Sequence, residues 1–356
     1  MQVAAPQDME TFNMAIIVLD LEWNQGFPQT PEQKFNEIIQ IGAVRLDTWE
    51  SEPKVFSQWV RPMYHRTLHY RVRELVPVDK RALHSAPNFF KVLKSFQAWC
   101  GPEAHFVTWG TEDLRVFHEN LDHYQLDGEW ITREYDLQKA YGYMCYDSNQ
   151  QFALKTAIEQ CGLEADLTFH DASHDAMYTA LIGKWMLARF GQLPDLDEVN
   201  RIFAQRAEEK RQALLAEAAR MAQALTQETE PLEQWECGPF PTAIACASSR
   251  DARLLTCPAC QNKLYHINYY PVGGELQFAA RARCSQHGPV YTILTVHEEA
   301  DGVYGTARAF AADSDAGRVY KICARYEEPA DLEAQPKRHR SRRHGRSRPE
   351  SGEPQA

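Results

Sequence analysis

The stretch Ala15-Ile-Ile-Val-Leu-Asp-Leu-Glu22 decides the fold that the sequence predicts. Its apolar run indicates a buried β-strand over residues 15–22, and the strand ends in two acids, Asp20 and Glu22. Residues two apart on a strand lie on the same face, so the two carboxylates are expected to lie close together. Such a pair is a candidate ligand set for a divalent cation. Taken alone, an Asp-Leu-Glu at a strand end is more often an exposed edge.

The segments that follow predict a mixed α/β domain that ends near Phe190. Two further strands are expected over residues 37–46 and 55–61, and their short connections suggest an antiparallel meander. The pattern then changes to helices over 88–99, 111–124, 152–161 and 172–189, with a short apolar run at 105–109. We therefore place a first domain at residues 15–190.

Beyond Phe190 the composition changes twice more. Residues 191–235 are rich in Ala, Glu, Arg and Leu, with apolar residues near helical spacing, which predicts a helical linker. Residues 236–330 contain short β-like runs and predict a small β-rich module. Residues 331–356 are basic and nearly devoid of apolar residues, so we expect a disordered tail.

Two more motifs place an acid where a helix begins. In His170-Asp-Ala-Ser-His-Asp-Ala176, the aspartate Asp175 falls in the first helical turn, and His170 can reach a water beside a metal held by that aspartate. In Trp109-Gly-Thr-Glu-Asp113, the aspartate follows a short strand and starts another helix. The alternative is that each aspartate merely complements a helix dipole and that His170 is a surface residue. For Asp113 alone we favour that alternative.

The three motifs together, in this order and spacing, resemble the DnaQ-like 3′→5′ exonucleases of the DEDDh type. That family has Asp-x-Glu at the end of the first strand, a middle Asp at the start of a helix, and His-x-Ala-x-x-Asp-Ala. Asp20-Leu-Glu22, Asp113 and the segment from His170 to Ala176 match this pattern. A tyrosine variant of the family has Tyr where this chain has Asp171, so the histidine type is indicated. The Asp-Leu-Glu-Trp start is similar to the branch of histone-mRNA and small-RNA 3′ exonucleases and a sporulation-inhibitor exonuclease.

The resemblance implies a fold, a chemistry and a substrate. The fold would be α/β and RNase H-like, a mixed sheet flanked by helices. Two Mg²⁺ or Mn²⁺ ions would be held by Asp20, Glu22, Asp113 and Asp175, and His170 would be the general base. Leu21 and Trp23, beside the carboxylates, are candidates to stack on or wedge the terminal base, with burial in the strand as the alternative for each.

A second constellation lies in the β-rich module. Cys257-Pro-Ala-Cys260 and Cys284-Ser-Gln-His287 form two knuckles whose spacing suits a tetrahedral Zn²⁺. Because the second knuckle is less usual, His266, Cys246 or Cys237 are alternatives to His287. We expect a structural zinc in a zinc-ribbon-like module, since a small β unit with little core gains stability from a metal. The alternative is a metal-free β module.

Charge and apolar content limit the remaining possibilities. The formal net charge of −11 argues against a protein that coats nucleic acid by charge alone. No apolar run approaches the ~20 residues of a membrane helix, so we expect a soluble, cytoplasmic protein. The predicted substrate is single-stranded nucleic acid with a free 3′ end, with RNA favoured over DNA. The rival functions are a DNA proofreading or repair exonuclease and a non-catalytic nucleic-acid-binding adaptor. The sequence does not identify a protein partner.

Overall fold

The computed structural model describes residues 15–25, 35–65, 67–76, 78, 80–266, 268–274 and 276–330, which form two compact units. The first unit ends at Ala204 and the second begins at Gln205. The predicted tail, residues 331–356, lies outside the described residues. Among the residues that are described, no helix combines the length and apolar character needed to cross a membrane.

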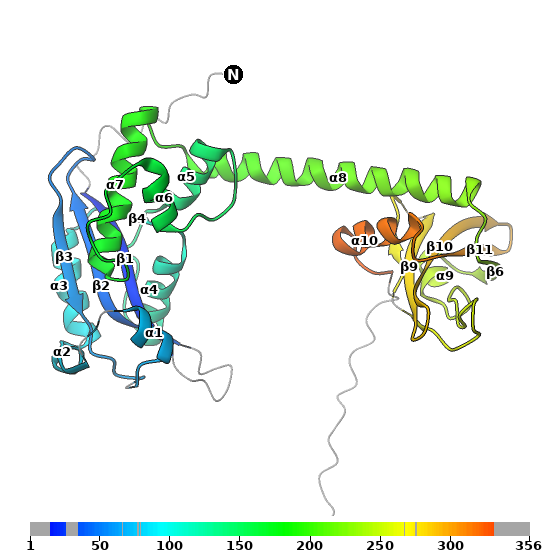
Figure 1. Ribbon diagram of the computed structural model, residues 1–356, viewed down its shortest axis with the longest axis horizontal. Helices are drawn as coiled ribbons and strands as arrows, with labels where there is room; N and C mark the ends of the chain where they lie inside the picture. The colour runs from blue at the N-terminus through cyan, green and yellow to red at the C-terminus, as the bar shows by residue number, and fades with distance from the viewer. Residues whose placement is uncertain are drawn as a thin grey trace, which may run out of the picture. The chain divides into compact units, whose positions relative to one another are not determined.

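The first unit is built on a five-stranded sheet with the order β3-β2-β1-β4-β5 (Figure 1). Its strands are β1 (Ala15–Gln25), β2 (Asn36–Leu46), β3 (Lys54–Trp59), β4 (Ala104–Thr108) and β5 (Glu134–Asp136). β1, β2 and β3 pair in antiparallel fashion, whereas β4 and β5 run parallel to β1. The expected meander is thus present, and β1 lies at the centre of the sheet.

Helices cover both faces of this sheet. The helices are α1 (Tyr70–Leu75), α2 (Lys80–Ser85), α3 (Phe89–Cys100), α4 (Glu112–His123), α5 (Leu137–Tyr146), α6 (Leu154–Cys161) and α7 (Ala172–Phe190). On one face, α3 and α4 pack with Ile17, Leu19 and Leu21 of β1. On the other, α5, α6 and α7 pack around Val18 and Val44. This alternation along β1 buries it on both faces. The predicted RNase H-like α/β architecture is confirmed.

The second unit is a six-stranded antiparallel sheet with the order β6-β11-β10-β9-β7, and β8 pairs with β9. Its strands are β6 (Glu233–Phe240), β7 (Tyr265–His266), β8 (Tyr270–Pro271), β9 (Gln277–Cys284), β10 (Gly288–Glu299) and β11 (Gly302–Phe310). The helices are α8 (Leu196–Glu228), in which the two units join, α9 (Ala243–Ser248) and α10 (Ala316–Tyr326).

The second half of α8 belongs to the core of the second unit. Ala218, Ala222 and Leu225 are buried against the sheet and against α10. The small alanine side chains allow the helix to lie close to the strands. The range predicted as a helical linker, residues 191–235, thus contains α8 at Leu196–Glu228 and the first residues of β6. The second half of α8 presents its apolar side to the core of the second unit, so that half is part of a folded unit.

Candidate active site

The end of β1 carries two of the predicted acids. Asp20 lies opposite Gly42 and Glu22 opposite Gln40 on β2, and the register shifts between Glu22 and Trp23. The shift leaves one extra residue on β2, so it is a β-bulge, a device that re-aims side chains at the end of a strand. Asp20 and Glu22 share the strand face that carries Val18, which packs with α7.

Asp113 reaches the same strand from α4. Its Oδ1 accepts a hydrogen bond from the backbone N–H of Leu21 at 3.0 Å. β1 pairs with β4 over Ala15–Val18, so this N–H lies beyond the ladder and the carboxylate takes the place of a strand partner. Asp113 is 6% exposed. The alternative of a helix-dipole acid at the surface does not describe a carboxylate buried against the neighbouring strand.

The start of α7 brings Asp175 and His170 to β1 and β2. Asp171 caps the helix, because its carboxylate accepts from the backbone N–H of Ser173 at 3.0 Å. The buried Gln40 side chain accepts from the N–H of Ala172 at 3.3 Å and so ties the first turn to β2. His170 has φ of 66°, a left-handed conformation that turns the chain into the helix.

Gly42 makes this close approach possible. A Cβ built on Gly42 would lie 2.0 Å from the carbonyl carbon of Ala172 and 2.1 Å from the amide nitrogen of Ser173. No side chain fits there, and the obstacle is helix backbone, which cannot rotate away. Gly42 therefore fixes how near Asp175 and His170 lie to the acids of β1.

Three of the predicted residues converge closely enough to share an ion. Ligand atoms of Glu22, His170 and Asp175 all lie within 4.8 Å of one another. Asp175 Oδ2 accepts the backbone N–H of His170 at 3.0 Å, whereas its Oδ1 is buried and accepts no hydrogen bond from any described residue. A buried carboxylate oxygen without a donor is costly unless a cation satisfies it. The residues present therefore fit a divalent metal with oxygen ligands.

The pKa values in the site report the crowding of carboxylates. Burial raises the pKa of Glu22 to about 8, with further contributions from Asp175 and Asp113. Burial likewise raises the pKa of Asp113 to about 7. The pKa of Asp20 is raised by burial and then by the charges of Asp113, Asp175 and Glu22, and that of Asp175 is raised chiefly by burial. Like charges this close favour protons or a cation between them.

The two histidines of the last motif have different surroundings. His170 is exposed and faces the carboxylates, whereas the ring of His174 bonds Thr168, with Nδ1 3.0 Å from the carbonyl oxygen. His174 thus holds the loop before α7. Of the two candidate base-contacting residues, Leu21 is 3% exposed inside the core, which favours the burial alternative for its side chain. Trp23 is partly buried against the same core.

Sequence reasoning missed a set of polar residues that hold the loop after β3. Glu37, 2% exposed, accepts the backbone N–H groups of Met63, Tyr64 and His65 at 2.5–2.8 Å. Asn24, fully buried, accepts the N–H of His69 at 2.8 Å. Asn24 and Glu37 are direct partners in the ladder between β1 and β2, within two residues of the bulge. A polar residue in an apolar run was the available signal for each.

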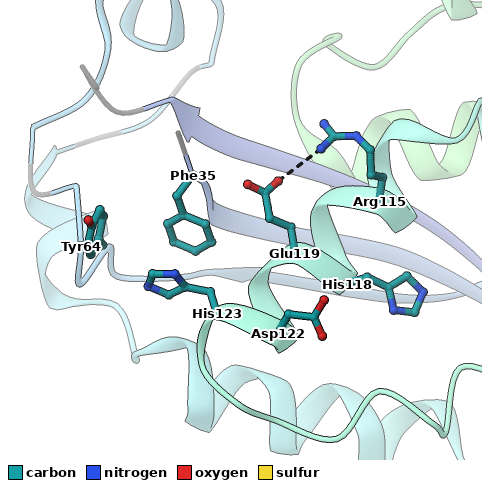
Figure 2. A pocket seen from close by; sticks show the side chains of 7 residues that line it. All are labelled: Phe35, Tyr64, Arg115, His118, Glu119, Asp122 and His123. Carbon is teal, nitrogen blue, oxygen red and sulfur yellow. Dashed lines mark hydrogen bonds and ion pairs between the residues drawn. The ribbon is translucent and has the colours of Figure 1, made fainter. Parts of the chain in front are cut away.

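A shallow pocket of about 720 Å³ lies over the last turns of α4 (Figure 2). The ring of Phe35 stacks on His123 with centroids 3.9 Å apart, and Tyr64 meets His123 edge-on at 5.2 Å. The Arg115 and Glu119 side chains on its rim pair at 3.3 Å. Its aromatic rings already contact one another, and none of the predicted catalytic residues lines it.

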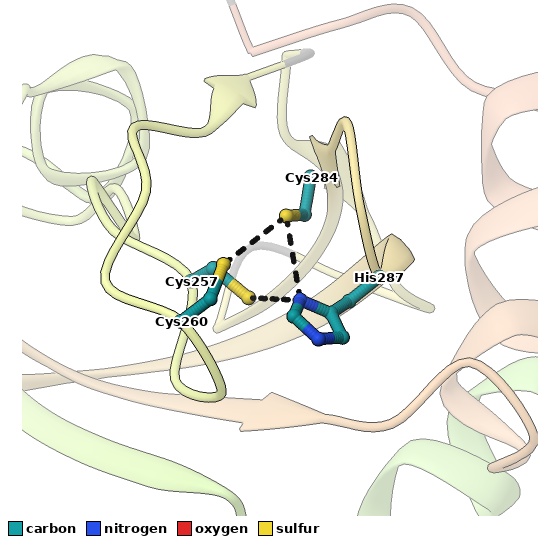
Figure 3. Close-up of side chains that lie close together, drawn as sticks. All are labelled: Cys257, Cys260, Cys284 and His287. Carbon is teal, nitrogen blue, oxygen red and sulfur yellow. Dashed lines mark hydrogen bonds between the residues drawn. The ribbon is translucent and has the colours of Figure 1, made fainter.

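The second unit brings together the four predicted zinc ligands (Figure 3). The sulfur atoms of Cys257, Cys260 and Cys284 and a ring nitrogen of His287 all lie within 4.8 Å of one another. His287 Nδ1 is 3.7 Å from Cys257 Sγ and from Cys284 Sγ. Backbone N–H groups of His287 and Gln286 lower the pKa of Cys284 to about 6, which favours the thiolate. The geometry is that of four ligand atoms around one point.

The alternatives to His287 fare differently. The sulfur atoms of Cys237 and Cys246 lie 3.7 Å from each other, and both residues are buried in an apolar cluster separate from that of Cys257 and Cys284. The side chain of His266 lies outside the described residues. Among the described side chains, His287 is the one of these candidates that lies beside the three cysteines.

Comparisons with known proteins found similarity over the first unit. The family model RNase_T, described as exonuclease, matches residues 17–182. No curated protein matches the chain. Among solved structures, the nuclease domain of 3′hExo, a DEDDh family member bound to rAMP, is 22% identical, with a TM-score of 0.47 over 52% of this chain and 96% of that one.

Two further solved structures are similar over the same part of the chain. A 3′-exonuclease that recognises the 3′ end of the histone mRNA stem-loop is 21% identical, with a TM-score of 0.47 over 52% of this chain and 86% of that one. Pop2p of S. pombe, in a form with bound Mg²⁺ and Mn²⁺, is 16% identical, with a TM-score of 0.38 over 49% and 83%. Residues 17–182 match the exonuclease family, in agreement with the family that the sequence predicts, and they carry the acids and the histidine of the DEDDh pattern.

Proposed function

We propose that this chain is a 3′→5′ exonuclease that hydrolyses single-stranded nucleic acid with the help of two divalent ions. The observation that carries the proposal is the convergence of Glu22, His170 and Asp175, together with the buried, donor-free Oδ1 of Asp175. Asp20 and Asp113 stand beside them, as the charges that raise the pKa of Asp20 show. A non-catalytic adaptor would gain nothing from burying carboxylates that repel one another.

The residues divide the chemistry among them. Asp20, Glu22, Asp113 and Asp175 would hold Mg²⁺ or Mn²⁺, which when bound supplies positive charge for an in-line displacement at phosphorus. His170 is exposed beside the carboxylates, where its ring takes a proton from the attacking water. The scissile bond is the one between phosphorus and the 3′ oxygen of the preceding nucleotide, which leaves as the new 3′ end. Asp171, Gln40 and Gly42 position the first turn of α7.

We further propose that Zn²⁺ occupies the Cys257, Cys260, Cys284 and His287 site in a structural role. Soft thiolates and an imidazole suit Zn²⁺, whereas the oxygen-rich site of the first unit suits Mg²⁺ or Mn²⁺. All four positions are taken by protein ligands, which is typical of a structural zinc. The second unit would then be stabilised by the metal without taking part in hydrolysis.

One assay tests the proposed activity. Matched 5′-labelled RNA and DNA oligonucleotides, single-stranded and double-stranded, are digested with Mg²⁺ and with Mn²⁺. We expect shortening from the 3′ end, fastest for single strands, with RNA preferred to DNA. A 3′-phosphate should block the reaction. Internal cuts, or full activity in a chelator, would contradict the proposal, and a preference for DNA would favour the proofreading or repair alternative.

A further inference from the structure

The second unit contains a local excess of positive charge in a strongly acidic chain. The chain has 38 Lys and Arg against 49 Asp and Glu. The stretch from Arg253 to His297, however, contains four basic residues and a single acid, Glu275. The basic residues are Arg253, Lys263, Arg281 and Arg283. This stretch contains the Cys/His cluster and strands β7 and β9. Clustered cations on a protein of opposite net charge point to an anionic ligand.

Three side chains of this stretch share one exposed face. Lys263 and Tyr265 flank the buried Leu264, so both point away from the core, and Tyr265 is 74% exposed. Arg283 lies between the buried Ala282 and Cys284 and points outward in the same way.

The register between the two strands then sets these side chains side by side. Tyr265 and Arg283 are direct partners in the antiparallel ladder between β7 and β9. Their side chains therefore lie next to each other, with Lys263 two residues along the same face. We call Lys263, Tyr265 and Arg283 the basic–aromatic strip.

None of these three side chains has a hydrogen bond or ion pair with another described residue. Arg281, the next residue along the same face of β9, is different, because its guanidinium lies 5.5 Å from the centre of the Tyr320 ring. A large exposed aromatic ring between two free cations has no structural role that the described contacts reveal. This combination is what a stacking platform for unpaired bases requires, with cations for the flanking phosphates.

The Cys/His cluster holds the strip in place. Lys263 follows Cys260 after two residues, and Arg283 directly precedes Cys284. The sulfur atoms of Cys260 and Cys284 lie 3.6 Å apart, so the cluster clamps together the two segments that carry the strip. A metal bound there would fix the spacing of the two cations on either side of the tyrosine.

We propose that the basic–aromatic strip binds single-stranded nucleic acid, with a base stacked on Tyr265 and phosphates on Lys263 and Arg283. The inference deepens the proposed function, on which it rests for the choice of nucleic acid over other polyanions. It gives the second unit a role in holding the substrate strand. Stacking tolerates any base, so the strip adds affinity without sequence preference.

Binding is measured on the full chain by fluorescence anisotropy of a labelled oligouridylate and its DNA counterpart, at several salt concentrations. An Asp20→Asn background prevents digestion. Tyr265→Ala should weaken binding by roughly 5-fold to 100-fold, the range typical of one lost base stack. Tyr265→Phe keeps the ring and should bind like the parent. Lys263→Glu with Arg283→Glu should weaken binding further and make log Kd less steep in log salt by about one unit per lost cation.

The matched control is Arg220→Glu, a charge reversal at an exposed position of α8 in the same unit. It should leave binding unchanged, which separates the strip from a general loss of positive charge. Zinc content and melting temperature of each variant show that the unit is folded. Parental affinity in both Tyr265→Ala and the double variant would overturn the proposal.

The test separates this inference from the proposed function. Suppose that the parent chain shows no cleavage and that the strip variants lose binding: the exonuclease proposal then fails and the proposal for the strip stands. If the parent cleaves and the strip variants bind and cleave long substrates as it does, the strip fails and the exonuclease stands. Cleavage is compared between the parent chain and strip variants that keep Asp20. A dinucleotide, too short to reach beyond the active site, should be cleaved equally by both.

Discussion

The two candidate metal sites are built in opposite ways. In the first unit, carboxylates from β1, α4 and α7 meet, and their ligands are spread from Asp20 to Asp175. In the second unit, two short knuckles supply Cys257, Cys260, Cys284 and His287 from one end of a sheet. The first site needs the whole domain to be folded before it exists. The second needs two loops and a metal, so the metal itself can hold the segments together.

The electrostatics differ in the same sense. The carboxylate site is strained without a cation, because burial and mutual repulsion raise the pKa of each of its four acids. In the thiolate site, backbone N–H groups hold the pKa of Cys284 low. A site that is unfavourable when empty suits ions that arrive with a substrate and act in catalysis. A site that holds one thiolate ready in this way, and fills all four positions with protein ligands, suits an ion that stays.

The largest effect is expected from removing a charged ligand of the first site. Asp20→Asn and Asp175→Asn keep the volume of the side chain and remove its charge, so each should lower cleavage beyond detection. The loss should exceed the ~10–100-fold typical of an outer contact around a metal. Digestion assays with protein free of host nucleases measure it, and circular dichroism controls for folding. Parental rates in either variant would show that these acids hold no catalytic ion.

The second prediction separates the two histidines. His170→Asn should lower turnover roughly 10²–10⁴-fold, since it removes the general base. Asparagine is the suitable replacement because it tolerates the left-handed backbone at φ of 66°. His174→Asn, the matched control, should mainly loosen the loop that its ring bonds at Thr168. Equal losses of turnover in the two variants would mean that the motif has a structural role.

Much of this arrangement was predictable, and the limits have physical causes. Apolar runs predicted β1 to β4 and the helices α3, α4, α6, α7 and α8, because burial on one or both faces leaves a periodic pattern. They did not predict α5, and the β-like reading of residues 236–330 missed α10. The C-x₂-C and C-x₂-H knuckles predicted their own geometry. The hydrogen bonds from Glu37 and Asn24 to the loop after β3 could not be predicted, since a buried polar residue differs from an exposed one only through partners distant in sequence. Tyr265 gained meaning only when the register placed Arg283 beside it.

The third prediction concerns the close packing of the start of α7 on Gly42 of β2, on which the first site depends. Gly42→Ala places a Cβ where the backbone of Ala172 and Ser173 now lies, so the start of α7 must move. A displacement of about 1 Å at a catalytic group can lower the rate by roughly 10²-fold. Gly128→Ala is the matched control, because its Cβ would meet only the Leu121 side chain, at 3.3 Å, and the His118 ring, at 3.6 Å. Parental cleavage by Gly42→Ala would contradict the packing described for α7.

The fourth prediction reverses the roles of the two units. Cys257→Ser should remove zinc and destabilise the second unit, yet leave cleavage of a dinucleotide within about 2-fold, because no knuckle residue belongs to the carboxylate site. Elemental analysis measures the zinc content, and thermal melting measures the stability of the second unit. Cys145→Ser, a half-buried cysteine of α5 away from both sites, is the control. Zinc-free parent protein, or loss of dinucleotide cleavage in Cys257→Ser, would refute a purely structural zinc.

The smallest expected effect is a dependence of metal binding on pH in the first site. The acids have folded-state pKa values above those of the unfolded chain, with Glu22 at about 8 and Asp113 at about 7. The metal-free folded state therefore binds more protons than the unfolded state between about pH 4 and pH 8, and its free energy of unfolding falls as pH rises through that range. A divalent ion competes with those protons, so its binding should release protons near neutral pH and tighten as pH increases.

Calorimetry of Mn²⁺ binding in buffers of different ionisation enthalpy counts the protons released. The count should fall steadily as pH rises from about 6 to above 8, because the carboxyls of the metal-free site are then increasingly ionised before the metal binds. Glu22→Gln should release fewer protons than the parent, because it removes the carboxyl whose pKa reaches about 8. Within the thiolate site, Cys284 has a pKa lowered to about 6, so this one ligand should contribute little proton release at neutral pH. Metal binding without proton release at pH 7, with an affinity independent of pH, would show that the four carboxylates are not close enough to repel one another.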